Sequence, residues 1–336
     1  MRILKFSGDN YALGYQLGLE SKNYFNHHIC ESLHYKKLLP YLESEWLKNT
    51  AAQIQHLLPS IYNELQGLAD GCERDFWEVL LWNCRGDLSP TGPEGCSSIG
   101  VKFKQSALLA HNEDGDPDLR DGCFILNAEL NNGTQFVSFV YPGSIPGHTM
   151  GMNNHGIAYT VNNIRLTEKQ IGIPRMITAR TLLEADSVEN FIDLLEKHDR
   201  VGGFHYNVAD RFNLTPISIE APFQGVSALA ADTVTVHANH LIHDKFVNID
   251  QIITKSSFCR QKQLQKLSLL NSKSLNEQVC INILKDTASE LPIYRMSPDD
   301  PDQENTLATV IFTLQKEAIQ MVVYDTIIGE KILLTV

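Results

Sequence analysis

The residues best suited to chemistry are Gly95-Cys96-Ser97-Ser98. A cysteine after a glycine, where helical patterns give way to strand patterns, is suited to be a nucleophile that chain cleavage exposes. Cleavage of the Gly95–Cys96 bond would give Cys96 a free α-amino group. The ordinary pKa of such an amine is about 7.7–8.0, so it can accept a proton near neutral pH. Cys96 would then carry both the nucleophile and the base.

An arbitrary cysteine is more often a small buried apolar residue than a nucleophile. That role is expected for the remaining cysteines, which are Cys30, Cys72, Cys84, Cys123, Cys259 and Cys280. They form no Cys-x-x-Cys pair, which favours a reducing compartment. No signal peptide follows Met1, and no apolar run approaches the roughly 18 residues that a membrane span needs. We therefore expect a cytoplasmic protein without a membrane span.

Helical patterns precede the candidate nucleophile. Apolar residues recur with helical spacing over residues 9–28, 41–69 and 73–84. Residues 86–95 contain two prolines and several glycines, which predicts a loop. We expect this loop to be exposed and flexible, as a cleavage linker would be.

Strand patterns dominate after Cys96, interrupted by two helical pairs. The expected strands are 96–103, 106–112, 122–130 and 134–141 as a β-meander, 148–152 and 157–162 as a hairpin, four short strands between 203 and 238, and 307–314, 318–325 and 331–335. The expected helices are 173–185, 187–198, 254–270 and 275–287. Helical pairs packed on stacked antiparallel sheets give a layered α+β domain.

The composition bounds the partners. The chain has 336 residues, of which 43% are hydrophobic and 20% charged, with a formal net charge of −12. An acidic chain of this kind is a poor partner for nucleic acid or anionic membranes. Small molecules are the expected partners.

Short segments in a fixed order along most of the chain resemble the acyl-coenzyme A:isopenicillin N / 6-aminopenicillanate acyltransferase-like family of N-terminal nucleophile hydrolases. The segments are Gly14-Tyr15-Gln16-Leu17-Gly18, Gly67 to Asp75, Trp82-Asn83-Cys84-Arg85, Gly95-Cys96-Ser97-Ser98, His111-Asn112-Glu113-Asp114, His237-Ala238-Asn239-His240 and Tyr294-Arg295. Each segment alone is weak evidence, whereas the ordered set is specific. Glu113 departs from the pattern, because an aromatic residue is common there.

The resemblance implies a four-layer αββα sandwich that cleaves itself. Residues 1–95 would be a helical propeptide that remains as a small subunit, and residues 96–336 would be the catalytic large subunit of one integrated domain. Cys96 would form an acyl-enzyme from a small-molecule amide or acyl thioester and pass the acyl group to water or to an amine. Acyl-coenzyme A is one donor that fits, and no cofactor is expected.

The resemblance also implies roles for two polar residues. Asp114 would orient the α-ammonium group of Cys96, and its spacing from Cys96 agrees with the family. Asn239 would donate its amide N–H to the tetrahedral oxyanion. The alternatives are a turn residue for Asp114 and a loop cap for Asn239.

Three further residues are candidates. Asn162 or Asn163 would help to line the oxyanion site, the alternative being a loop cap. Arg295 would hold the thiolate or a substrate carboxylate, the alternative being a surface arginine paired with Asp299 or Asp300.

No metal site is expected. The spacing of His237, His240 and His243 invites a metal interpretation, but they follow a strand-to-loop pattern without a fourth ligand.

Two alternative functions remain. A catalytically silent small-molecule binding protein could use the same fold. A papain-like enzyme with a histidine base would begin a helix at its cysteine, whereas Cys96 is predicted to begin a strand.

Overall fold

The strands form two sheets that lie face to face in this computed structural model, which describes residues 1–89, 92–296, 303–325 and 331–335. The larger sheet has the order β1 (Arg2–Gly8), β4 (Phe124–Leu130), β5 (Gln135–Val140), β6 (Met150–Asn153), β7 (Ile157–Ile164), β8 (Gly203–Asp210), β9 (Ile217–Ala221) and β10 (Ser227–Ala230). The smaller sheet has the order β11 (Val234–His237), β2 (Glu94–Lys102), β3 (Ala107–Gly115), β12 (Asn305–Leu314), β13 (Ile319–Asp325) and β14 (Lys331–Thr335).

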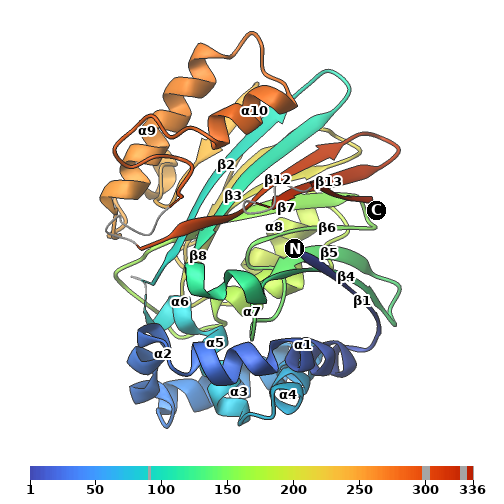
Figure 1. Ribbon diagram of the computed structural model, residues 1–336, viewed down its shortest axis with the longest axis vertical. Coiled ribbons are helices and arrows are strands. Elements are labelled where there is room, and N and C mark those ends of the chain that lie inside the picture. Colours follow the sequence, from blue (N-terminus) through green and yellow to red (C-terminus); the bar gives the residue numbers. More distant parts are fainter. Residues whose placement is uncertain (90–91, 297–302, 326–330, 336) are drawn as a thin grey trace.

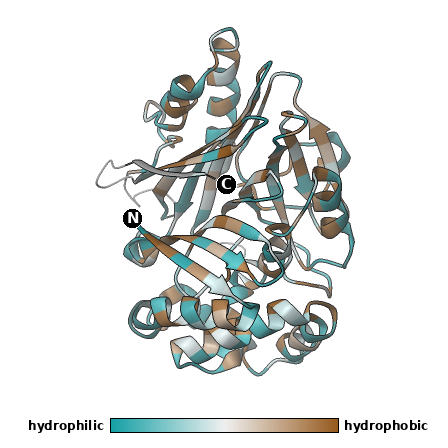
Figure 2. Ribbon diagram, turned by 90° about the vertical axis from the view of Figure 1, so that its right-hand side faces the viewer, coloured by the Kyte–Doolittle hydropathy of each residue, from teal (hydrophilic) through white to brown (hydrophobic). Residues whose placement is uncertain are grey.

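Helices cover the outer face of each sheet, as Figures 1 and 2 show from two sides. Helices α9 (Lys255–Leu270) and α10 (Glu277–Leu284) share a core with the smaller sheet. A second core joins the larger sheet to the remaining helices. These are α1 (Asn10–Tyr24), α2 (Leu33–Leu38), α3 (Glu45–Leu57), α4 (Pro59–Cys72), α5 (Phe76–Asn83), α6 (Arg85–Leu88), α7 (Arg175–Leu182) and α8 (Val188–Glu196). The predicted α+β class and the four-layer αββα arrangement are confirmed.

The N-terminal segment adds a strand to the larger sheet and packs closely on itself. Strand β1, which the sequence patterns did not predict, pairs in parallel with β4. Helix α1 packs against α4 so closely that a Cβ atom added at Gly14 would lie 1.9 Å from the carbonyl oxygen of Glu64. The expected helix over 41–69 is two helices, because Pro59 cannot continue the first and instead begins the second.

The expected β-meander over residues 96–141 is wrong, although its strands exist. Strands β2 and β3 belong to the smaller sheet, whereas β4 and β5 belong to the larger one. Between them the chain crosses from one sheet to the other through a 3₁₀ segment at Pro117–Gly122. Local alternation of apolar residues predicts a strand but not the sheet in which the strand pairs.

The expected exposed loop over residues 86–95 is also wrong in its described part. Helix α6 is buried, and Gly95 lies inside strand β2. Polar contacts hold this segment: the backbone N–H of Arg175 donates to Asp87 at 3.0 Å, and Arg165 donates to the carbonyl of Glu94 at 3.1 Å. Pro90 lies outside the described residues. Within the described residues, no helix is both long enough and apolar enough to cross a membrane.

Candidate active site

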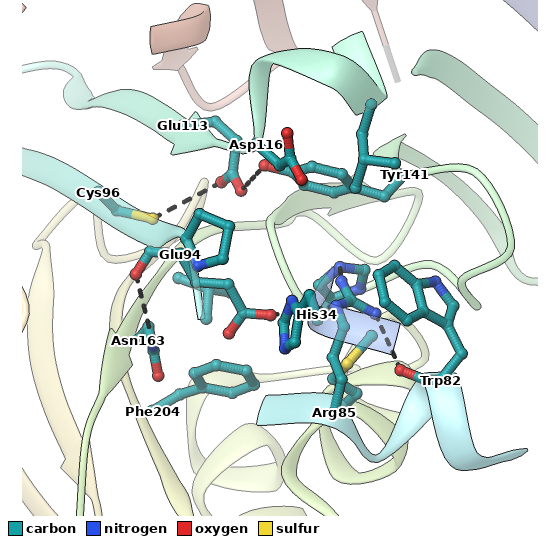
Figure 3. Close-up of a pocket in the computed structure, with 15 residues that line it drawn as sticks. His34, Trp82, Arg85, Glu94, Cys96, Glu113, Asp116, Tyr141, Asn163 and Phe204 are labelled. Atoms are coloured by element: carbon teal, nitrogen blue, oxygen red, sulfur yellow. Dashed lines mark hydrogen bonds and ion pairs between the residues drawn. The ribbon is translucent and has the colours of Figure 1, made fainter. Parts of the chain in front are cut away.

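Cys96 is the third residue of strand β2, and its side chain faces a cavity between the two sheets and the N-terminal helices. Trp82, Tyr141 and Phe204 form part of the wall of this cavity. Figure 3 shows the thiol and Glu113 on one side of this cavity. The thiol of an intact chain therefore already faces this cavity.

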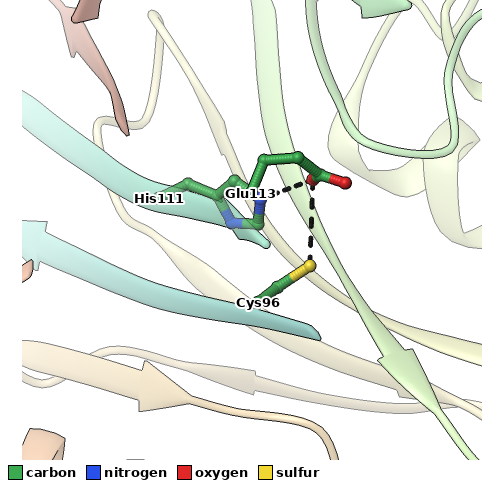
Figure 4. Close-up of side chains that lie close together, drawn as sticks. All are labelled: Cys96, His111 and Glu113. Atoms are coloured by element: carbon green, nitrogen blue, oxygen red, sulfur yellow. Dashed lines mark hydrogen bonds and ion pairs between the residues drawn. The ribbon is translucent and has the colours of Figure 1, made fainter. Parts of the chain in front are cut away.

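Glu113 contacts the thiol, and the sequence analysis did not identify it as a functional residue. Strands β2 and β3 pair Cys96 with Glu113, so the two side chains share one face of the sheet. The distance from Cys96 Sγ to Glu113 Oε2 is 3.8 Å. His111, two residues earlier on the same face, places its Nε2 atom 3.1 Å from the same oxygen (Figure 4). The hydroxyl of Tyr141 donates to the other carboxyl oxygen at 2.9 Å.

The hydrogen bonds of His111 determine where the protons lie. Ser98 donates its hydroxyl proton to Asn162 Oδ1 at 2.6 Å, so it accepts from His111 Nδ1 at 2.8 Å. His111 Nε2 is then an acceptor, and the carboxyl of Glu113 donates to it. Burial acts in the same direction, because it raises the pKa of Glu113 well above its ordinary value and lowers the pKa of His111 to about 3.

The backbone amide of Cys96 binds the side chain of Asn239. Cys96 N donates to Asn239 Oδ1 at 3.0 Å, and Asn239 Nδ2 donates to the carbonyl of Asn163 at 3.1 Å. Asn239 therefore lies against the nucleophile, but its amide N–H contacts a carbonyl in the intact chain. Its expected role as an oxyanion donor stays a prediction.

Arg260 is a second residue that sequence reasoning missed. It projects from α9 and donates to Asn239 Oδ1 at 2.7 Å and to the carbonyl oxygen of Cys96. It is fully buried, and burial lowers the pKa of its guanidinium. No local motif marks it, because a contact between a helix and a strand so far apart in sequence leaves no short-range pattern.

Asn163 and Asn162 point to different surroundings. Asn163 Nδ2 donates to the carbonyl of Glu94 at 3.3 Å, and Asn163 lines the cavity with Cys96. Asn162 instead bonds Ser98 and the carbonyl of His237. Of the two candidates, only Asn163 contacts the segment that precedes the Gly95–Cys96 bond.

Asp114 and Arg295 lie on the opposite face of strand β2 from the thiol. Asp114 pairs in register with Gly95, and its Oδ1 atom accepts from Thr306 at 2.6 Å. Arg295 is buried and forms an ion pair with Glu304, so it is not a surface arginine. Asp299 and Asp300, its alternative partners, lie outside the described residues. The α-ammonium that Asp114 would orient exists only after cleavage, so that role stays a prediction.

The three histidines of the 237–243 segment have separate partners. His237 contacts Glu220 at 2.9 Å, His240 contacts Ser257 at 2.8 Å, and His243 contacts Ser218 at 3.0 Å. A different group, Cys96, His111 and Glu113, brings its ligand-type atoms within 4.8 Å of one another.

The comparisons with known proteins agree with the sequence motifs. Residues 101–327 match the family model described as acyl-coenzyme A:6-aminopenicillanic acid acyl-transferase. A β-alanyl-dopamine/carcinine hydrolase of Drosophila melanogaster is 26% identical over 219 residues, which are 58% of this chain and 57% of that protein. The 40 kDa form of an acyl-coenzyme A:6-aminopenicillanic-acid-acyltransferase of Emericella nidulans is 25% identical over 155 residues, which are 42% of this chain and 43% of that protein.

The matches thus span about half the length of these relatives. A solved structure, that of a mutant conjugated bile acid hydrolase from Clostridium perfringens, aligns with a TM-score of 0.43 and 11% identity, over 71% of this chain and 96% of that chain. The family model covers well over half of the chain, so this chain belongs to the acyl-coenzyme A:6-aminopenicillanic acid acyl-transferase family.

Proposed function

We propose that the chain cleaves its own Gly95–Cys96 bond and then works as an amidohydrolase or N-acyltransferase with Cys96 as the nucleophile. The observation that carries the proposal is the position of the Cys96 thiol, which faces a cavity directly beside the bond to Gly95. Membership of a family whose matched relatives are hydrolases and acyltransferases supports it. Residues 1–95 would remain as a small subunit, because their helices share a core with the larger sheet.

In the first step the thiol attacks the carbonyl carbon of Gly95. The C–N bond then breaks, the amine of Cys96 takes up a proton, and water hydrolyses the resulting thioester. Before cleavage the chain has no α-amine at this position, so the thiol proton needs another acceptor. Glu113 lies 3.8 Å from Sγ and contacts His111, so its carboxylate is the acceptor in the intact chain once it has lost the proton that it donates to His111.

In the mature enzyme the new α-amine replaces this acceptor. It forms where Asn239 already binds the nitrogen of Cys96, with Arg260 against the same oxygen of Asn239. Asp114, Asn239 and Asn163 keep the roles expected from the sequence, around a tetrahedral intermediate formed on Cys96. Arg295 lies on the face of β2 opposite the thiol and pairs with Glu304, so it is given no role in this step. Water as acceptor gives hydrolysis, and an amine gives acyl transfer.

The test is mass spectrometry of the purified protein before and after exposure to acyl donors. We expect a fragment that begins at Cys96 and an acyl group added to that residue. Preferential labelling of Cys96 by iodoacetamide should accompany cleavage. An intact chain with no preferential labelling would instead support the silent binding protein.

Gly95 is constrained by the residues that pack on it. A Cβ atom at this position would lie 2.1 Å from Glu304 Oε2 and 3.1 Å from Arg295 Nη1. We expect Gly95→Ala to displace the scissile carbonyl and to slow self-cleavage by about 10-fold or more, since misplacement of about 1 Å can cost two orders of magnitude in rate. Time courses by gel electrophoresis measure the rate. Addition of Glu304→Asp, which shortens the clashing side chain, should restore part of it, and an unchanged rate in Gly95→Ala would contradict the geometry.

Zinc should inhibit self-cleavage and the later reactions of the Cys96 thiol. A thiol, an imidazole and a carboxylate are ligands that Zn²⁺ prefers, and these atoms of Cys96, His111 and Glu113 lie within 4.8 Å of one another. We expect Zn²⁺ to slow self-cleavage and alkylation of Cys96, with reversal by a chelator. Mg²⁺, which prefers oxygen ligands, is the control ion. His111→Ala should weaken the inhibition and His243→Ala should not, so equal sensitivity of both variants would contradict a site at Cys96.

A further inference from the structure

The side chain of Glu94 enters the same cavity as the Cys96 thiol (Figure 3). Its carboxylate is bound on both sides by arginines. Arg85 Nε lies 3.1 Å from Oε1, and Arg175 Nη2 lies 2.9 Å from Oε2. The side chains of Arg85 and Arg175 are only 4% and 3% exposed. Two buried cations thus converge on one carboxylate inside the candidate active site.

Other contacts fix both guanidinium groups in place. Arg85 Nη1 donates to the carbonyl of Trp82 at 3.2 Å and to Ser144 at 3.1 Å. It also lies over the Trp82 ring at 4.4 Å. Arg175 Nη1 donates to the carbonyl of Ile164 at 3.0 Å and to Asn163. Because these partners are backbone groups, neutral side chains and an aromatic ring, they position the arginines without neutralising them.

Among the described residues, Glu94 is the carboxylate that forms ion pairs with Arg85 and Arg175. Burial alone would raise the pKa of Glu94, but Arg85 and Arg175 lower it to about 2. The nearby Asp87 accepts from the backbone N–H of Arg175 instead. Burial lowers the pKa of His34 to about 4 and that of His148 to about 3, so neither adds a cation near neutral pH.

The position of Glu94 in the chain connects these contacts with the proposed reaction. In self-cleavage, Glu94 and Gly95 lie on the acyl side of the bond that Cys96 attacks. The thioester therefore carries the Gly95 carbonyl, with the Glu94 carboxylate bound by the arginines. Later acyl groups form a thioester with the same sulfur and occupy the same side of it. Once the end of the propeptide moves away, two buried arginines are left without their carboxylate, which is costly unless another anion replaces it.

We propose that Arg85 and Arg175 form a carboxylate-binding subsite that selects acyl groups ending in a carboxylate. The proposal rests on the proposed function, in that it names the acyl class for the same nucleophile. The path from the Gly95 carbonyl carbon to the Glu94 carboxyl carbon has as many chain atoms as octanedioic acid. An octanedioyl amide is therefore the matched probe.

The experiment compares three p-nitroanilides on the mature enzyme: the octanedioyl monoamide, which is an anion, the neutral octanoyl amide, and the cationic 8-aminooctanoyl amide. We expect kcat/KM for the anion to exceed that for the neutral amide by about 10- to 100-fold, as suits hydrogen bonds to a charged group. The cation should be the slowest. An anion that reacts no faster than the neutral amide would overturn the subsite.

Variants of Arg175 test whether this side chain produces the preference for the anionic amide. In Arg175→Gln the ratio of kcat/KM between anion and neutral amide should fall toward one, and Arg175→Lys should keep part of it. The ratio does not depend on how much of the preparation is active, so partial misfolding does not affect it. Arg2→Gln, an exposed arginine paired with Glu20, is the control and should keep the full ratio. If Arg175→Gln kept the wild-type ratio of kcat/KM between anion and neutral amide, Arg175 would not be part of the subsite.

A binding measurement separates failure of the subsite from failure of the proposed function. Free octanedioate should protect Cys96 from iodoacetamide at a concentration about 10-fold lower than octanoate does. If no anilide reacts but this preference holds, the carboxylate subsite stands and the proposed catalysis fails. Equal protection by both acids would overturn the subsite whether or not the enzyme turns over.

Discussion

Replacement of Cys96 by alanine is expected to leave one intact polypeptide of about 37.8 kDa, whereas the wild-type chain should separate under denaturing conditions into residues 1–95 and 96–336. In the proposed self-cleavage the thiol attacks the carbonyl of Gly95, and no other described cysteine lines the cavity beside that bond. The same variant should lose amide cleavage by roughly 10⁴-fold or more, because removal of a nucleophile removes every step that passes through the acyl-enzyme. Gel electrophoresis and an amide-cleavage assay measure the two effects.

Two other variants make this result specific. Cys123→Ala removes a cysteine that is also buried and whose thiol donates to the carbonyl of Leu119, so it should leave cleavage unchanged. Cys96→Ser keeps a nucleophilic atom of lower reactivity and should cleave slowly. Cleavage between Gly95 and residue 96 in the alanine variant would show that another group breaks this bond, and it would rule out the proposed nucleophile.

Much of the fold followed from short-range patterns. The helix expected over residues 187–198 is present at Val188–Glu196, where Ser187 caps it by accepting from the N–H of Asn190. The strands of the C-terminal half also lie where their apolar alternation predicts. Such patterns act over a few residues, so they do not reveal which sheet a strand joins. The separation of β3 from β4 and the parallel pairing of β1 therefore required the structure.

Only part of the site was predicted, again because sequence patterns are short-range. Motifs pointed to Cys96 and Asn239, and the structure places their atoms in contact. Glu113 was set aside as a departure from the family pattern, although the antiparallel register places it opposite Cys96. A hairpin register counted from the turn at residues 103–106 would have found it, because paired residues share a face. Arg260 carried no comparable signal.

The second large effect is expected in Glu113→Gln, which should slow self-cleavage. A glutamine keeps the size of the side chain and can still donate to His111, but it cannot accept the thiol proton. If the ionised carboxylate of Glu113 is the acceptor in the intact chain, self-cleavage should slow by about 10²- to 10³-fold, the range of general base catalysis. The mature fraction that slowly accumulates should lose less than about 10-fold in amide cleavage, because its α-amine serves as the base.

The pH dependence distinguishes this role from a structural one. Burial raises the pKa of Glu113, and below that pKa the carboxyl carries a proton and cannot accept another. The rate of self-cleavage in the wild-type chain should therefore rise with pH until it passes the raised pKa, well above the ordinary value of 4.5. The glutamine variant has no such group, so this rise should be missing from its profile. A structural defect would lower the rate at every pH and keep the shape of the curve. A slow variant with the wild-type profile would thus assign the proton to another acceptor, of which His111 is the nearest.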